Sequence, residues 1–252
     1  MDPDTMAGGY GLKRYFNGEA AHLIGGRIRA VYPGFDIEGY AAETERRVPG
    51  KELKERVLVL AEGLRTRLPG DYPGAVSVLL APLGDELAEG EGVFNTSWFL
   101  MPVARFVEEY GPEHPELSLG AIEEITRRHT GEYAIRPYIE RHRGQVMERI
   151  VRWARSPSHN VRRLASGGVR PRLPWARTLD VFVKDPRPVP EVLEPLRRDP
   201  SGHVRRSVAN NLDDISRDNP GAALATAPRR AGWRRAPSPR PSGSSGTGCA
   251  PW

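Results

Sequence analysis

Two pairs of adjacent arginines lie in segments of this chain that repeat each other. Residues 157–163 read Pro-Ser-His-Asn-Val-Arg-Arg and residues 200–206 read Pro-Ser-Gly-His-Val-Arg-Arg, which gives a period of 43 residues. Guanidinium groups bind phosphate oxygens, and a helix N-terminus also favours anions. The serine of each copy is a candidate N-cap, which would start a helix just before the arginines. The repeat therefore predicts phosphate contacts by Arg162, Arg163, Arg205 and Arg206.

The segment between the two copies carries further groups that could bind a nucleic acid. Residues 161–176 contain four arginines, two prolines and a tryptophan, and Arg170 and Arg172 add to the cationic side chains. Trp175 follows a proline and could place a flat π surface against a base or a cation. The alternative for Trp175 is a core anchor between repeats, which is the commoner fate of a tryptophan.

The charge of the chain is unevenly distributed. The net charge is +5, but residues 1–135 carry 14 basic and 22 acidic side chains, whereas residues 136–217 carry 18 basic and 9 acidic ones. A basic half next to an acidic half is typical of a protein that binds a polyanion. Solvated helix faces are the alternative, and charge alone favours neither interpretation.

Cysteine and histidine usage argues against disulfides and metal sites. The one cysteine, Cys249, excludes a disulfide within the chain and fits a reducing cytosol, so we expect a cytoplasmic protein. The six histidines show no paired metal-ligand spacing. No apolar run approaches the length of a membrane span, and Met1-Asp2-Pro3-Asp4 does not resemble the start of a signal peptide.

The elements that must position these residues are predicted to be helices. Apolar residues recur at helical spacing in residues 53–68, 103–110, 119–125, 146–153 and 204–215, and no pair of strands is indicated. With a 43-residue repeat, this pattern predicts an all-α fold, a HEAT-like or armadillo-type α-solenoid with a concave basic groove. We expect residues 1–220 to form this domain. Residues 221–252, rich in Pro, Ser, Gly and Arg, are expected to be a disordered basic tail.

Several motifs together resemble one family. Residues 161–176, 182–189 and 203–216, and also residues 130–138 (Thr-Gly-Glu-Tyr-Ala-Ile-Arg-Pro-Tyr), are similar to the AlkC branch of the AlkC/AlkD DNA alkylation-repair proteins. The resemblance runs from about residue 10 to about residue 220. It implies a monomeric DNA glycosylase with a HEAT-like solenoid, which removes cationic alkylated bases of the 3-methyladenine type from double-stranded DNA. It also implies that no metal or organic cofactor is used.

The resemblance implies roles for individual residues. Glu132, Asp214 and Trp175 match the family's catalytic positions: two carboxylates to stabilise an oxocarbenium-like sugar, and an aromatic ring to contact the charged base. Without the resemblance, ion pairs with Arg136 and Arg217 on the same helices would be preferred for the two acids. The residues expected to bind DNA are Arg136, Arg162, Arg163, Arg170, Arg172, Arg205, Arg206 and Asn210.

The chain departs from the family at residue 167. The family usually reads Ser-Glu-Gly where this chain has Ser166-Gly167-Gly168, so one carboxylate is absent. We expect weak or narrowed activity, and a higher rate in Gly167→Glu. One alternative is a catalytically impaired HEAT-repeat DNA-binding protein. Another is an adaptor for protein partners, which the repeated arginine pairs disfavour. A second departure follows residue 220, where many relatives continue into a small β-sandwich domain.

Overall fold

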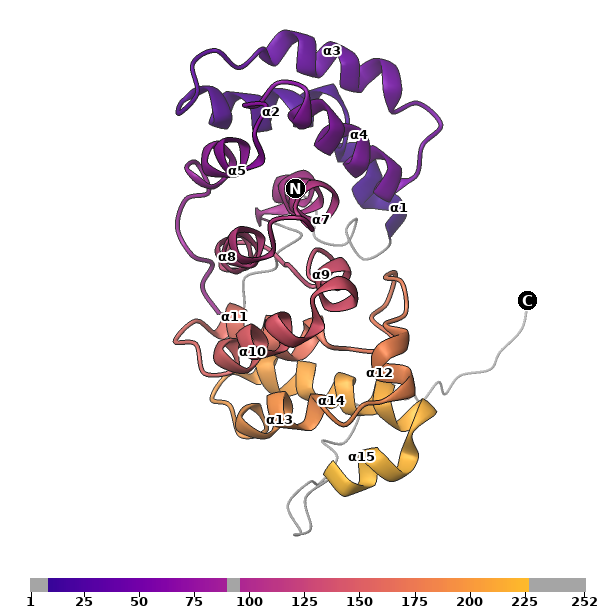
Figure 1. The fold of residues 1–252 in the computed structure, drawn as a ribbon. Helices are drawn as coiled ribbons and strands as arrows, with labels where there is room; N and C mark the ends of the chain where they lie inside the picture. The colour runs from indigo at the N-terminus through magenta and orange to yellow at the C-terminus, as the bar shows by residue number, and fades with distance from the viewer. Residues whose placement is uncertain (1–8, 90–95, 227–252) are drawn as a thin grey trace, which may run out of the picture.

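The computed structural model describes residues 9–89 and 96–226, which fold into helices and connecting loops without a strand among them. The helices are stacked broadly in the order of the chain, from α3 at the top of Figure 1 to α15 at the bottom. This stack confirms the expected all-α, HEAT-like solenoid. Among the described helices, none combines the length and the apolar character that crossing a bilayer requires.

In the described part of the chain the α-helices have the following bounds, and three short 3-10 turns lie between them. They are α1 (Gly9–Leu12), α2 (Gly18–Arg29), α3 (Ile37–Arg47), α4 (Leu53–Arg65), α5 (Tyr72–Leu80), α7 (Met101–Tyr110), α8 (Pro115–Thr126), α9 (Arg136–Arg141), α10 (Arg143–Trp153), α11 (His159–Gly168), α12 (Asp180–Lys184), α13 (Val189–Leu193), α14 (Gly202–Asp218) and α15 (Pro220–Thr226).

The 43-residue repeat corresponds to α11 and α14, which pack against each other. Both predicted N-caps are confirmed: Ser158 Oγ accepts a hydrogen bond from the Val161 N–H at 3.2 Å, and Ser201 Oγ accepts one from the Val204 N–H at 3.4 Å. Val161 and Val204 are buried at equivalent places. The repeat therefore sets two helices side by side with the same cap and the same buried position.

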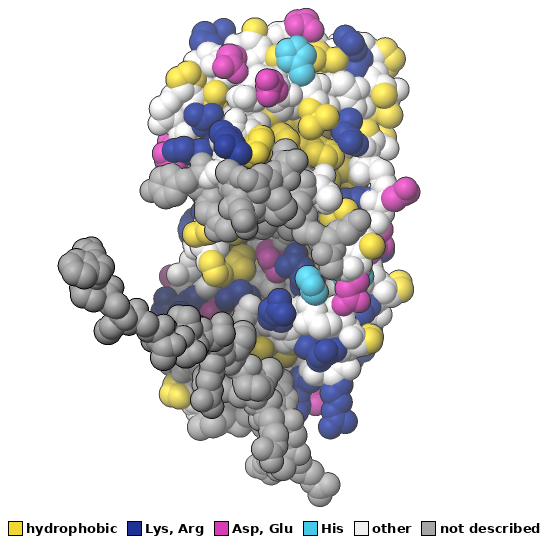
Figure 2. Space-filling view, turned by 180° about the vertical axis from the view of Figure 1, so that it is seen from behind, with side chains coloured by type: hydrophobic (Ala, Val, Ile, Leu, Met, Phe, Trp, Pro, Cys, Tyr) yellow, Lys and Arg dark blue, Asp and Glu magenta, His cyan; other side chains and the backbone are white. Residues whose placement is uncertain are grey.

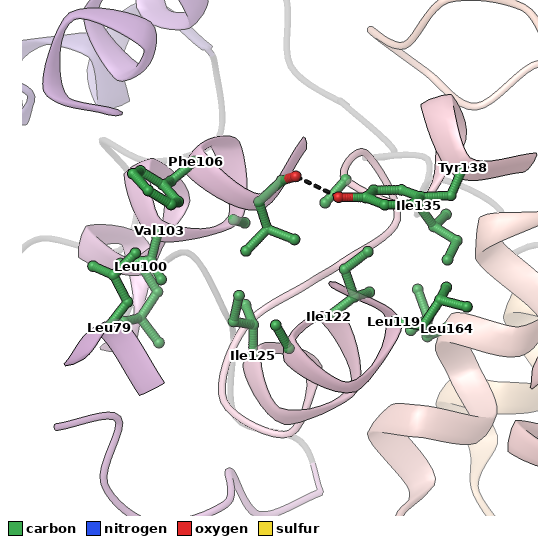
Figure 3. Close-up of a cluster of buried hydrophobic side chains, with 14 of the residues drawn as sticks. Leu79, Leu100, Val103, Phe106, Leu119, Ile122, Ile125, Ile135, Tyr138 and Leu164 are labelled. Atoms are coloured by element: carbon green, nitrogen blue, oxygen red, sulfur yellow. Dashed lines mark hydrogen bonds between the residues drawn. The ribbon is translucent and has the colours of Figure 1, made fainter. Parts of the chain in front are cut away.

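The core continues from the repeat into the middle of the molecule. Figure 3 shows Phe106 of α7, Ile122 and Ile125 of α8 and Tyr138 of α9 in one buried cluster. The hydroxyl of Tyr138 donates a hydrogen bond to the Val107 carbonyl at 2.5 Å, so the one polar atom of this large side chain is satisfied inside the core. This packing fixes α9 and the residues just before it, which belong to the candidate site.

The folded part extends past the predicted boundary at residue 220. Helix α15 packs on α14, and Ala222 and Ala223 are partly buried against the core. Proline is accepted in the first turn of a helix, and alanine is a strong helix former, which explains why Pro-Gly-Ala-Ala continues the stack. Residues 227–252, the remainder of the expected tail, lie outside the described residues.

Candidate functional site

The first arginine of each repeated pair is bound to the loop before its own helix. Arg162 Nη1 donates to the carbonyls of Ser156 and Pro157, each at 2.9 Å. Arg205 Nη1 makes the equivalent bond to the carbonyl of Pro200, also at 2.9 Å. These two guanidinium groups therefore satisfy backbone carbonyls at the starts of α11 and α14.

Arg162 also joins the two repeats through a buried aspartate. Its Nε and Nη2 donate to the two carboxylate oxygens of Asp199 at 2.6 and 3.0 Å, and the Ser201 N–H donates to the same carboxylate at 2.9 Å. Burial alone would raise the pKa of Asp199, but the bonds from Arg162 and Ser201 more than offset it, so the pKa lies below its ordinary value.

Carboxylates lie at the N-termini of α11 and α14, where we expected phosphates to bind. Ser158, the N-cap of α11, donates a hydrogen bond to Glu86. Glu89 lies at the start of α14, and its hydrogen bond with Ser201 is the largest cause of its lowered pKa. A phosphate at either N-terminus would therefore compete with an acidic side chain of the loop after α5.

Glu132 lies in the turn between α8 and α9 and reaches the surface of α11. Its carboxylate accepts hydrogen bonds from Arg163 Nη1 at 3.1 Å and from Thr130 Oγ1 at 3.3 Å. The side chain is 13% exposed. It also fills the space next to Gly167: a Cβ atom at residue 167 would lie 1.8 Å from Glu132 Oε1.

Asp214 is buried on α14 and bound to an arginine from the loop after α11. Arg170 donates to its two carboxylate oxygens from Nε at 2.8 Å and from Nη2 at 3.2 Å, and the Asp214 side chain is 3% exposed. Neither acid forms the ion pair within its own helix that sequence alone would favour, with Arg136 or Arg217. Both are instead paired across the tertiary structure, with arginines 31 and 44 residues away.

The two carboxylates are bound by the C-terminal half of α11 and by the loop that follows it. Arg163 and Gly167 contact Glu132, and Arg170, one turn further along the chain, holds Asp214. Arg163 and Gly167 are four residues apart and share one face of α11, and Arg170 follows in the loop after the helix. Both acidic residues that were predicted for catalysis are thus bound by arginines of the segment 163–170.

Arg136 is buried, and its guanidinium donates to backbone carbonyls of the loop after α11. It binds the carbonyls of Arg170 at 3.1 Å, Pro171 at 3.4 Å and Arg177 at 2.9 Å. Burial lowers its pKa to about 10. In this arrangement Arg136, which was expected to bind DNA, positions residues 170–177 and has little surface left for a phosphate.

Trp175 is presented at the end of this loop rather than packed in the core. Its side chain is 67% exposed, which is against the alternative of a core anchor, and its φ of +63° lies in the left-handed region that bulky residues avoid. The Tyr133 hydroxyl donates to the Pro174 carbonyl at 3.1 Å, and Lys54 donates to the Trp175 carbonyl. With Arg136, these donors hold a backbone conformation that would otherwise be unfavourable.

A cavity of about 420 Å³ opens beside residues 175–177. It is bounded by α4, α7, α9 and residues 175–177, and its walls include Lys54, Glu108, Tyr133, Arg136 and Trp175. Burial raises the pKa of Glu108, which pairs with Arg105.

The face in Figure 2 carries Lys and Arg side chains over both the upper, N-terminal part and the lower, C-terminal part, among scattered acidic ones.

The other predicted DNA contacts differ in their surroundings. Arg172 forms a bidentate pair with Asp218, at 2.7 and 2.8 Å. Arg206 and Asn210 are exposed on α14, one turn apart, and Asn210 is the repeat equivalent of Gly167. Arg206 and Asn210 thus present their side chains to solvent, whereas Arg162, Arg163, Arg170 and Arg172 are each engaged by an acid.

Sequence reasoning missed several residues that shape the site. Thr130 orients Glu132, and Tyr133 and Lys54 hold the carbonyls around Trp175. Thr130 and Tyr133 carried a signal, since both belong to the motif of residues 130–138 around Glu132. Lys54 is 121 residues from Trp175, and no local pattern connects the two.

Comparisons with known proteins identify relatives of this chain, while no protein-family model matches it. The uncharacterized protein YhaZ of Bacillus subtilis (strain 168) is 36% identical over 211 residues, which is 83% of this chain and 56% of YhaZ. The alkylpurine DNA glycosylase AlkC of Pseudomonas fluorescens, solved bound to DNA with an abasic-site analog, superposes with a TM-score of 0.77 at 31% identity. That match covers 85% of this chain and 58% of AlkC. The chain therefore spans a little over half the length of either relative.

Proposed function

Because this chain belongs, in sequence and in fold, to the AlkC branch of the AlkC/AlkD DNA alkylation-repair family, we propose that it is a DNA glycosylase. Its proposed substrates are cationic alkylated bases of the 3-methyladenine type in double-stranded DNA. The observation that carries the proposal is that two carboxylates with little exposure, Glu132 and Asp214, are each bound by an arginine of the segment 163–170, which the exposed Trp175 follows.

The chemistry of an alkylated purine suits two carboxylates. The base already carries a positive charge, so the C1′–N bond is weak and its electron pair leaves with the base, which becomes neutral. Positive charge develops on the sugar as an oxocarbenium-like species, and a carboxylate beside it stabilises that charge. Water then adds to C1′ and loses a proton. In this proposal Glu132 and Asp214 stabilise the sugar and orient the water, and no step is assigned to a metal or an organic cofactor.

The surroundings of Glu132, Asp214 and Trp175 support these roles. Arg163 and Arg170 hold Glu132 and Asp214 in fixed orientations, and charge-assisted hydrogen bonds of this kind are the strongest that side chains form. Trp175 would make the cation–π contact with the charged base, because its ring is exposed and its backbone is held by three side chains. The proposed partner is duplex DNA, and the proposed state is a cytoplasmic monomer.

The test is release of free methylated base from methylated duplex DNA, with protein in excess over DNA. We expect release by the natural chain and none above background by the Glu132→Gln/Asp214→Asn double variant. Binding of an abasic duplex by the double variant serves as the control for folding. Binding without release by the natural chain would reject the glycosylase and leave the second candidate, a catalytically impaired DNA-binding protein.

A further inference from the structure

Residues 132 and 167 compete for the same volume at the surface of α11. A Cβ atom on Gly167 would lie 1.8 Å from Glu132 Oε1, 2.7 Å from its Cδ and 3.1 Å from its Cγ. No two non-bonded carbon and oxygen atoms approach to 1.8 Å, so even alanine at residue 167 must displace the carboxylate. The carboxylate is the far end of a flexible side chain, whereas residue 167 is fixed in a buried helix. The expected response is therefore a movement of Glu132 and not of α11.

The neighbouring glycine shows how specific this contact is. A Cβ atom on Gly168 would meet only apolar carbons, Ile135 Cγ2 at 3.1 Å and Leu164 Cδ1 at 3.6 Å. Both glycines are buried in the last turn of α11, but only Gly167 faces a charged group. A general requirement for small residues in this turn would therefore affect both positions, whereas a role at the carboxylate concerns Gly167 alone.

Any displacement of the carboxylate would break a defined set of contacts. Glu132 Oε1 accepts from Arg163 and Oε2 accepts from Thr130 Oγ1. These two bonds orient the carboxylate, and Oε1 is the same atom that occupies the space above Gly167. A side chain at residue 167 and the Arg163–Glu132 bond therefore cannot coexist in the observed geometry.

We propose that Gly167 is a positioning residue, and that in this chain the Glu132 carboxylate occupies a shared volume, the one that a side chain at residue 167 would fill. The inference rests on the proposed glycosylase function for its effect on rate, but the shared volume itself is independent of that function. The missing side chain at residue 167 is what admits Glu132 to its place between Arg163 and Thr130.

This proposal reverses the expectation from sequence that Gly167→Glu raises the rate. In the natural chain the volume is already occupied by a carboxylate, so a second one would lie against the first with only one arginine to bind both. Like charges at such a separation repel each other. We therefore expect Gly167→Glu to slow base release. A carboxylate should be useful at residue 167 only after the one at residue 132 is removed.

The experiment compares four full-length variants: Gly167→Ala, Gly168→Ala as the matched control, Glu132→Ala, and the transposed Glu132→Ala/Gly167→Glu. Single-turnover release of methylated base is measured at saturating protein, and the Kd for abasic duplex DNA separately. Gly167→Ala should slow release by about 100-fold, since a misplacement of about 1 Å can cost that much, with the Kd within about two-fold. Gly168→Ala should retain the natural rate. The transposed variant should exceed Glu132→Ala by at least about ten-fold, because its carboxylate returns to the same volume.

Two outcomes would overturn the proposal: Gly167→Ala as fast as the natural chain, or a transposed variant no faster than Glu132→Ala. If the natural chain releases no base, the proposed function fails, and a crystal structure of Gly167→Ala decides the positioning role by itself. The Arg163–Glu132 bond must then be broken in that structure, and an intact bond would reject the shared volume. If Gly167→Ala does not fold, Glu132→Ala/Gly167→Ala must fold, since the clash is gone, and its failure to fold would also reject the proposal.

Discussion

The two acids of the candidate site differ from ordinary surface carboxylates because each is held by one arginine from a distant part of the chain. Asp214 and Arg170 are nearly buried, and their bidentate geometry gives the pair a fixed orientation. Asp218 and Arg172 repeat the same geometry one turn along α14, but at a more exposed place. The two pairs therefore form a natural comparison between a buried and an exposed ion pair on the same two elements.

Asp214→Asn should lower both stability and the rate of base release. Removal of one charge leaves Arg170 buried without its counter-ion, which costs about 3 kcal/mol in the free energy of unfolding. The rate should fall by more than in any single arginine-to-alanine variant, because a carboxylate facing the sugar acts where charge develops. Urea denaturation and single-turnover release measure the two effects. Asp218→Asn is the control and should change neither, so equal effects in the two variants would show that burial is not decisive.

At the scale of elements, the helices are joined by buried polar groups as well as by apolar contacts. Asp199 connects the start of α14 to Arg162 of α11. A second junction surrounds Gly111 at the end of α7, where Tyr72 and Ser118 are hydrogen bonded at 2.7 Å and Ser118 donates to the Gly111 carbonyl at 2.9 Å. Such junctions fix how one helix sits on the next, which apolar packing alone specifies less sharply.

The Asp199 junction should make stability depend on pH in the acid range. Its pKa is lower in the folded chain than in the unfolded one, so its contribution is present above about pH 4 and is lost as the pH falls through the folded pKa. The natural chain and Asp199→Asn should therefore differ in urea midpoint at neutral pH and converge as the pH falls below the ordinary pKa of an aspartate. Parallel curves over that range would mean that Asp199 titrates in the folded chain as it does in the unfolded one.

The Gly111 junction should be intolerant of even a methyl group. A Cβ atom there would lie 2.2 Å from Tyr72 Oη, 2.3 Å from Tyr138 Oη and 2.4 Å from Ser118 Oγ. Gly111→Ala should cost about 3 kcal/mol, since the three hydroxyls are locked by their own hydrogen bonds. Gly120→Ala in α8 is the control: its Cβ would meet only Arg149 Nη2 at 4.0 Å, so helix propensity should stabilise it by up to about 1 kcal/mol. Thermal melting of both variants checks the sign of each change.

For the whole molecule, the excess of basic residues in the C-terminal half does not translate directly into a free basic surface. Many arginines there are engaged by acids or by backbone carbonyls, including the first member of each repeated pair. The second members differ: Arg163 is at the edge of the candidate site, and Arg206 is exposed on α14. The partners of each arginine within the chain, rather than the number of arginines, should decide which of them neutralises phosphate.

Salt dependence of DNA binding should separate the two kinds of arginine. Arg206→Ala should weaken binding of duplex DNA and reduce the slope of log K against log salt by up to about 1, for the one phosphate that is no longer neutralised. Arg162→Ala/Arg205→Ala should instead lower the melting temperature and leave the slope unchanged, because those side chains bind loop carbonyls. A reduced slope in the second variant would show that the first arginines also reach the DNA.

The sequence by itself determined the features that depend on near neighbours. The apolar stripes, the serine caps at residues 158 and 201 and the 43-residue period predicted the helices and the solenoid, because each signal is contained within a few residues or one repeat. The motifs around Glu132, Asp214 and Trp175 were also visible, but only as a resemblance. Their mutual arrangement was not.

Only the tertiary structure decided which side chains meet. The partners of Glu132, Asp214 and the Trp175 carbonyl are 31, 44 and 121 residues away, and these distances are closed by the stacking of helices, which no local pattern encodes. The same stacking places the Glu132 carboxylate above Gly167. A glycine that looked like a missing catalytic group in the sequence is, in three dimensions, the space that another carboxylate occupies.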